Sequence, residues 1–236
     1  MMDLYGGKDP RELPAYGIVE AAHYLRIPPS TLRTWLRGRT YPTTQGEQWS
    51  EPVIKLADES RGLLSFVNLT EAHVLGAIRQ SKVPFRSIRR GLDYLYRQFP
   101  SPHPLAEKDF ETDGMDLFVD HLGEVVNITQ GGQIGIREFL KTYLKRIERD
   151  MTGIATKLYL FNRRDLPPTE VQQTRVVVDP RISFGRPVLV GSHIATRVVY
   201  QRFAAGDSVE ELAADYARPS SDIEEAIRCE QFEQAA

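Results

Sequence analysis

Side chains suited to contacting a phosphate backbone gather between residues 30 and 41. Short hydroxyl side chains let a helix approach DNA closely, and a guanidinium group holds a phosphate or a guanine edge. Four of the side chains in this stretch share one helix face, because they are spaced i, i+3, i+4, i+7: Ser30, Arg33, Thr34 and Arg37. Spacing alone equally fits a solvated amphipathic helix. The candidate DNA-binding residues are Ser30, Thr31, Arg33, Thr34, Arg37, Arg39 and Tyr41.

Two short helices are expected to position these side chains. Residues 17–25 carry apolar side chains at helical spacing, and Pro28 and Pro29 end that helix and begin the next. The second helix runs to about Gly38, and its buried stripe is Leu32, Trp35 and Leu36. A tight turn between two helices, of which the second is exposed and basic, predicts a helix-turn-helix.

The segment GIVEAAHYLRIPPSTLRTWLRG (17–38) resembles the opening of MerR-type winged helix-turn-helix regulators. The resemblance implies that Arg33 grips a phosphate and that a wing lies between Tyr41 and Val53. The sequence departs from that family at two positions. Arg26 stands in place of the usual turn glycine, and Pro28 replaces the usual capping serine.

Composition limits the classes of protein to consider. The 236 residues are 41% hydrophobic and 26% charged, which is ordinary for a globular protein. A single cysteine, Cys229, fits a reducing cytosol. No run of eighteen apolar residues and no signal peptide is present, so we expect a cytoplasmic protein without a membrane partner.

Charge is distributed unevenly along the chain. Residues 1–99 carry 14 Lys and Arg against 10 Asp and Glu, whereas residues 179–236 carry 6 against 10. Such a basic head and acidic tail can face different partners.

Proline-rich segments at 100–104 and 162–174 divide the chain into three parts. We expect an α+β protein: a winged helix-turn-helix domain (11–99), a small mixed α/β middle segment (104–165), and a β-hairpin with a trihelical, homeodomain-like domain (175–236). Strands are expected at 53–57, 63–69 and 155–161, and a hairpin at 116–129. Helices are expected at 70–80, 85–98, 133–149, 196–205, 208–216 and 221–232.

The C-terminal helices have a charge unsuited to DNA. Residues 207–233 hold nine acidic residues and two arginines, which would repel phosphates. This face is either simply solvated or a docking surface for a basic partner, and the sequence leaves both possibilities open.

The segment from Asp179 to Tyr216 resembles a bacterial domain of uncharacterised function that occurs in antitoxins. The shared pattern is Asp-Pro, Gly-x-Pro-Val, Gly-x-x-Ile and Gly-x-Ser-x-Glu-Glu with a following Tyr. His193 stands where that family usually has arginine. With the regulator-like head, the chain resembles a mycobacterial VapB-type antitoxin over residues 16–232.

This resemblance implies two activities. The protein would neutralise a PIN-domain ribonuclease toxin and would repress its own operon by binding operator DNA. Because one short reading helix gives little specificity, we also expect a homodimer. The expected toxin-binding residues lie on the last helix: Glu224, Glu225, Arg228, Glu230 and Phe232.

Catalytic and metal-binding patterns are missing from the sequence. The five histidines are scattered, no triad signature occurs, and GGQIG (131–135) lacks the lysine of a phosphate loop. We therefore expect neither an enzyme nor a cofactor. The main alternative is a stand-alone MerR-like regulator that senses a small ligand through Tyr143, Tyr159 and Phe161. A basic face on the 133–149 helix (Arg137, Lys141, Lys145, Arg149) could extend the DNA footprint or simply be solvated.

Overall fold

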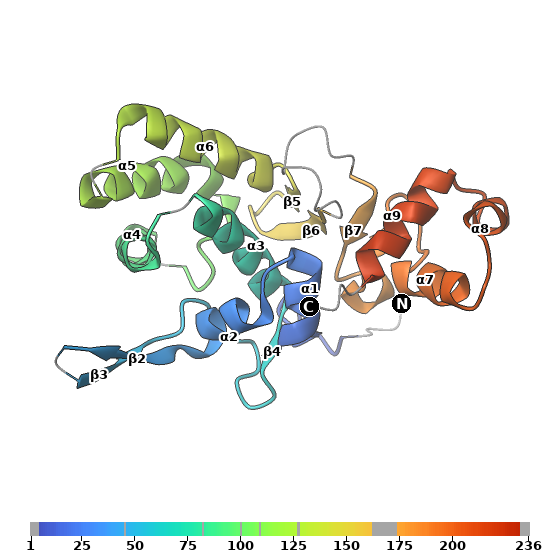
Figure 1. Ribbon diagram of the computed structural model, residues 1–236, viewed down its shortest axis with the longest axis horizontal. Coiled ribbons are helices and arrows are strands. Elements are labelled where there is room, and N and C mark those ends of the chain that lie inside the picture. The colour runs from blue at the N-terminus through green and yellow to red at the C-terminus, as the bar shows by residue number, and fades with distance from the viewer. Residues whose placement is uncertain are drawn as a thin grey trace. The chain divides into compact units, whose positions relative to one another are not determined.

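The computed structural model describes residues 5–44, 46–81, 83–99, 101–108, 110–126, 128–161 and 174–231. The chain divides into two compact units (Figure 1). The N-terminal unit comprises residues up to Lys145 together with Arg149–Ala155, and the C-terminal unit comprises Arg146–Glu148 and the chain from Thr156 on. Both contain helices and strands, which confirms the α+β class.

The N-terminal unit begins with a short strand and two helices. Strand β1 (Tyr16–Gly17) pairs antiparallel with β4 (Leu63–Leu64). Helices α1 (Ile18–Leu25) and α2 (Pro29–Arg37) follow, and then the hairpin of β2 (Arg39–Thr43) and β3 (Gly46–Ser50). The two helices are therefore where the sequence predicted them. The hairpin spans 39–50, whereas the resemblance implied a wing between Tyr41 and Val53.

A buried helix forms the centre of this unit. Helix α3 (Phe66–Gln80) is buried at every residue from Phe66 to Ile78. Ser65 caps it, because its hydroxyl accepts a hydrogen bond from the Asn68 amide at 3.2 Å. The predicted strand at 63–69 is wrong beyond Leu64, since a helix buried all round lacks the apolar periodicity that distinguishes helix from strand. The strand expected at 53–57 does not form either.

Helices α4 (Phe85–Gln98), α5 (Met115–Val126) and α6 (Gln130–Leu144) complete the unit, with a π-helical turn at Phe110–Gly114. The hairpin predicted at 116–129 is wrong: Phe118, Val119 and Leu122 are buried on one side of α5. Gly123 lies inside this helix, where the Gln133 side chain covers it. Helix α6 ends at Leu144 instead of residue 149, and Arg149 belongs to strand β5.

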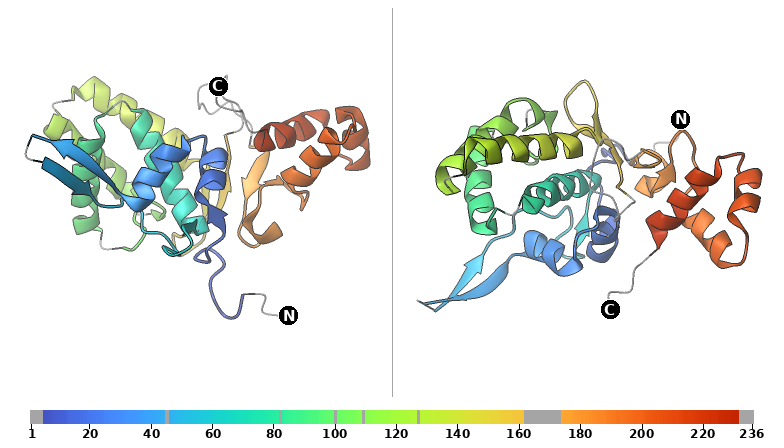
Figure 2. Two further views of the ribbon diagram at one scale, coloured as in Figure 1. Left: turned by 60° about the horizontal axis from the view of Figure 1, so that its bottom comes forward. Right: turned by 45° about the horizontal axis from the view of Figure 1, so that its top comes forward.

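The C-terminal unit combines a small sheet with three helices (Figure 2). The sheet has the order β5-β6-β7-β8, formed by Ile147–Arg149, Ala155–Tyr159, Val176–Val178 and Val188–Leu189. Arg149, the last residue of β5, and Ala155, the first residue of β6, belong to the N-terminal unit. The predicted helices are present as α7 (Thr196–Ala204), α8 (Val209–Asp215) and α9 (Ser220–Glu230).

The middle segment, predicted at 104–165, does not form a compact unit of its own. Helices α5 and α6 pack on α4 and α3 of the N-terminal unit, whereas Thr156–Tyr159 of β6 joins the C-terminal sheet. Gly91 of α4 shows how close this packing is, because an added Cβ there would lie 2.8 Å from the Phe118 ring. Among the described residues, no helix is long and apolar enough to cross a membrane.

Candidate nucleic-acid interface

The turn between α1 and α2 is made by three residues. Arg26 adopts the left-handed conformation (φ 57°, ψ 38°), and the amide of Ile27 donates to the carbonyl of Ala22 at 3.0 Å. This conformation costs a non-glycine residue about 1–2 kcal/mol. The turn thus keeps its geometry although arginine replaces the expected glycine. Pro28 precedes α2 without a side-chain cap, as its residue type requires.

Helix α2 buries one face and exposes the other. Leu32, Trp35 and Leu36 are 0%, 2% and 3% exposed, which fixes the rotation of the helix. Ser30, Arg33 and Arg37 are exposed, and Thr31 and Thr34 are half-buried. The Thr34 hydroxyl donates to the Ser30 carbonyl at 3.0 Å. Ser30, Arg33 and Arg37 therefore share the exposed face, whereas Thr31 and Thr34 are only partly exposed.

The arginines of this region differ in whether their side chains contact other residues. The side chains of Arg33 and Arg39 are exposed and form no hydrogen bond or ion pair with any described residue. The Arg37 guanidinium instead lies against the backbone of Gly62, where it would clash with an added Cβ. Arg33 and Arg39 are thus the cations most available to a phosphate.

The wing starts directly at the end of α2. Gly38 has φ +69° and ψ −175°, and a Cβ there would collide with the Ser50 carbonyl oxygen and lie 2.7 Å from the Trp49 ring. Only glycine tolerates this close approach. The Tyr41 hydroxyl donates across the hairpin to the Gln48 amide oxygen at 3.2 Å, so Tyr41 stiffens the wing.

Helix α4 supports both α2 and the wing. The Phe85 ring stacks on Trp35, with ring centroids 6.2 Å apart and planes 9° apart. Arg89 donates to the Glu51 carbonyl at 2.7 Å, just after β3. The amides of Val53 and Ile54 both donate to the Trp35 carbonyl, at 2.7 and 3.2 Å.

The contacts of α4 bring two further arginines to the candidate interface, which the sequence patterns did not indicate. Arg86 and Arg90 on α4 are exposed and form no ion pair with any residue whose placement is described. The run RSIRRG (86–91) is a basic signal, but only the Phe85–Trp35 and Arg89–Glu51 contacts place it beside the wing.

The basic face predicted on the helix at 133–149 does not extend this surface. Arg137 is ion-paired with Asp116 at 2.8 Å and also with Asp120, so it joins α6 to α5. Arg149 is buried and paired with Glu111 at 2.5 Å. Arg137 and Arg149 are thus used inside the unit, whereas Lys141 and Lys145 of the same predicted face are exposed.

The predicted toxin-binding residues of α9 are less available than expected. Arg228 forms ion pairs with Glu224 at 2.7 Å and Glu225 at 3.1 Å. Glu230 is only 8% exposed and accepts a hydrogen bond from the Thr196 hydroxyl, so a surface role for it is wrong. It follows Ile223, Ala226 and Ile227 on the inward face. Phe232 lies outside the described residues.

The aromatic residues proposed for a ligand pocket have separate surroundings. Tyr143 is 7% exposed in the core of the N-terminal unit, and its hydroxyl accepts a hydrogen bond from Gln80 at 2.8 Å. Burial raises the pKa of Tyr143 to about 12. Tyr159 and Phe161 belong to the C-terminal unit. Because Tyr143 fills the core of its unit, its position counts against the ligand-sensing alternative.

Two family models match the chain. Residues 14–92 match a putative DNA-binding HTH domain, and residues 176–228 match a domain described as a protein of unknown function (DUF433). The first match spans the helix-turn-helix, the wing and α3, and ends within α4.

Whole-chain relatives come from Mycobacterium tuberculosis. A solved crystal structure of Rv2018 is 27% identical, has a TM-score of 0.65, and is matched over 92% of this chain and 98% of its own. The uncharacterized protein Rv2308 is 23% identical over 90% of this chain and 88% of its own length. The putative antitoxin VapB45 is 31% identical over 92% of this chain and 93% of its own length. The chain therefore belongs to the family of the putative antitoxin VapB45, with a helix-turn-helix domain of the DNA-binding type.

Proposed function

We propose that this protein is the antitoxin of a type II toxin–antitoxin system. Its N-terminal unit binds operator DNA and represses the operon, and its C-terminal part, residues 175–236, neutralises a PIN-domain ribonuclease toxin. The protein acts in the cytoplasm, and no catalytic role is proposed for it.

The observation that carries the DNA-binding part is the polar face of α2. Ser30 and Arg33 are exposed on a helix whose opposite side is anchored by Leu32 and Trp35. A rigid helix that exposes short hydroxyls and an unpaired guanidinium suits insertion into the major groove. The wing and Arg86 and Arg90 of α4 would add phosphate contacts on either side.

The small size of this surface supports a homodimer. One short helix contacts few base pairs, and helix-turn-helix proteins gain specificity by reading two half-sites about one helical turn apart. We propose that two copies of the chain bind one operator in this way.

The toxin-binding part rests on the relative's name and on the charge of the C-terminal unit. The relative is called a putative antitoxin, and residues 179–236 carry 6 Lys and Arg against 10 Asp and Glu. An acidic surface suits a basic groove on a ribonuclease and does not suit DNA.

Co-expression with the neighbouring open reading frame tests this proposal. We expect the two proteins to purify as a stable complex without ribonuclease activity, and free toxin to cleave RNA. Operator binding by the complex is measured on the DNA upstream of the gene. The absence of a complex, with DNA binding intact, would leave a stand-alone regulator as the better account.

A further inference from the structure

A strained loop in the C-terminal unit holds an aromatic side chain in solvent. Ser183 and Phe184 have φ of 50° and 54°, and Phe184 is 72% exposed. The left-handed conformation costs about 1–2 kcal/mol at each non-glycine residue. Exposing a phenylalanine forgoes the stabilisation that burial would give. Strain of this kind concentrates where a surface has a function.

The loop is fixed by its own hydrogen bonds. The Ile182 amide donates to the Asp179 carbonyl at 2.9 Å, and the Arg186 amide donates to the Ser183 carbonyl at 3.0 Å. The Arg181 amide donates to Oδ1 of the Asp179 carboxylate at 2.9 Å. The Phe184 ring is therefore presented from a defined backbone, which reduces the entropy lost when a partner binds it.

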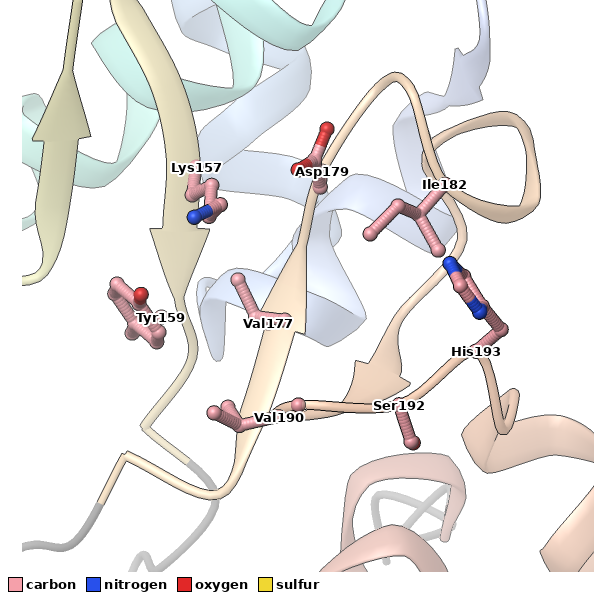
Figure 3. A pocket seen from close by; sticks show the side chains of 9 residues that line it. Lys157, Tyr159, Val177, Asp179, Ile182, Val190, Ser192 and His193 are labelled. Carbon is pink, nitrogen blue, oxygen red and sulfur yellow. The ribbon is translucent and has the colours of Figure 1, made fainter.

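A pocket opens beside this loop, within the same unit. It has a volume of about 260 Å³ and is lined by residues of β6, β7 and the loops on either side of β8. Figure 3 shows Lys157 and Tyr159 on one side of it and Ile182 and His193 on the other, with Val177 and Asp179 between them. Pockets for drug-sized ligands generally exceed about 300 Å³, so this pocket suits a single side chain better.

The charge of the pocket decides which side chain fits. Lys157 Nζ is paired with Glu148 at 2.8 Å, and the Tyr159 hydroxyl donates to the same carboxylate at 2.9 Å. The Lys157 charge is thus already compensated. Asp179 is 7% exposed and makes no direct ion pair with any residue in the described ranges, although its charge acts on Lys157 at longer range. Lys157, Glu148 and Asp179 together therefore leave one negative charge uncompensated. A carboxylate removed from water in this way favours a cation beside it.

We propose that the Asp179 pocket and the exposed Phe184 together form the docking site for the partner toxin, and that the pocket takes an arginine side chain of that partner. A guanidinium group can pair with the Asp179 carboxylate in a forked geometry and stack on the Tyr159 ring. An apolar side chain next to that arginine would cover Phe184. This inference rests on the proposed antitoxin function for the identity of the partner, but the pocket's preference for a guanidinium can be measured alone.

The first test uses N-acetyl-L-argininamide as a probe of the full-length protein. We expect saturable amide chemical-shift changes at Val177, Gly191 and His193, and none with the uncharged N-acetyl-L-norleucinamide at equal ionic strength. Asp179→Asn keeps an oxygen that can accept from the Arg181 amide but removes the charge. It should weaken probe binding at least about tenfold, as expected for a charge-assisted hydrogen bond.

Glu210→Gln is the matched control, since it removes the same charge from an exposed position of α8 in the same unit. It should leave probe binding unchanged. Equal binding by the wild type and Asp179→Asn, or the absence of saturable changes at the pocket, would overturn the arginine assignment.

The second test uses the purified toxin and Phe184→Gly. Glycine adopts the left-handed conformation without strain, so this variant should raise the melting temperature of the C-terminal unit. It should nevertheless weaken the toxin complex by at least about tenfold, as expected when an interface aromatic is removed. A complex that forms equally well with Phe184→Gly and Asp179→Asn would overturn the docking site and leave the antitoxin function standing. The absence of any complex with the wild type would contradict the antitoxin function and the partner named here, while the probe titration would still decide the pocket's preference.

Discussion

The helix-turn-helix surface and the C-terminal unit differ in how many of their arginines are paired with acids. Around the helix-turn-helix, four exposed arginines pair with no acid among the residues that the structure describes: Arg33, Arg39, Arg86 and Arg90. In the C-terminal unit, Arg202 is paired with Asp207 and Asp215, and both Arg175 and Arg218 are paired with Asp222. Arg228 is paired on α9 as described above.

The comparison shows that helical shape alone does not identify a DNA-binding surface. Both units place short helices next to one another, and helices α7 to α9 could be mistaken for a second helix-turn-helix. DNA affinity depends on cations that replace the counterions of the phosphate backbone. Cations already paired with carboxylates contribute little to it.

Substituting Trp35 should have the largest effect and should separate the two units. Trp35 is 2% exposed and stacked on Phe85, so Trp35→Ala should cost about 3–5 kcal/mol. Hydrogen exchange of amides in α2 should accelerate strongly, while exchange in α9 should stay as in the wild type. Trp49→Ala is the matched control, because Trp49 is 57% exposed, and it should cost less than about 1 kcal/mol. Equal acceleration in both units would mean that they unfold as one.

Substituting Gly38 should disturb the wing without unfolding the unit. The Cβ of alanine would collide with the Ser50 carbonyl at a backbone conformation that favours glycine. We expect Gly38→Ala to cost about 1–3 kcal/mol in urea unfolding and to weaken DNA binding. Gly135→Ala in α6, where an added Cβ meets nothing within 4 Å, is the control; it should leave DNA binding unchanged and should not lower stability. Normal DNA binding by Gly38→Ala would remove the wing from the interface.

Substituting Arg33 should change binding but not folding. Arg33→Ala should weaken binding to all DNA sequences and should lower the slope of log affinity against log salt by about one. Arg197→Ala removes an equally exposed arginine from α7 of the C-terminal unit and should leave the slope unchanged. Fluorescence anisotropy at several salt concentrations measures both. An unchanged slope for Arg33→Ala would remove this residue from the phosphate contacts.

The smallest expected effect concerns acid stability of the N-terminal unit. Hydrogen bonds from Thr152, Arg11 and two backbone amides hold the pKa of Asp150 at about 2. The unfolded value is about 3.9, so the charged carboxylate stabilises the fold fully above about pH 4. This contribution is lost as the pH falls towards 2. Asp150→Asn should therefore flatten the pH dependence of urea unfolding between these values, and an unchanged profile would contradict the pairing.

The sequence predicted those features that depend on neighbouring residues. The α2 face follows from helical spacing and from two prolines, and the helix expected at 208–216 is present as α8. The sequence could not predict features that depend on contacts between residues far apart in the chain. Helix α3 is buried all round and so has no amphipathic pattern. Glu230 is an acid of a type usually found at the surface, and only the structure shows its buried hydrogen bond with Thr196.

The role of α4 shows the same limit. The arginines of α4 are evident in the sequence. Their position beside the wing is not, because it depends on the hydrogen bond from Arg89 to Glu51, 38 residues away. The division into units was also hidden, because the helices of the middle segment pack on one unit and Thr156–Tyr159 of its last strand pairs within the other.

Mapping amide chemical shifts of the full-length protein on DNA tests the central claim most directly. The probe is the duplex upstream of the gene, titrated at moderate salt. We predict changes at Ser30, Arg33 and Thr34, along the β2–β3 wing and at the start of α4, with α8 and α9 unchanged. Changes concentrated on α8 and α9, or an unperturbed α2, would contradict the assignment of DNA binding to the N-terminal unit.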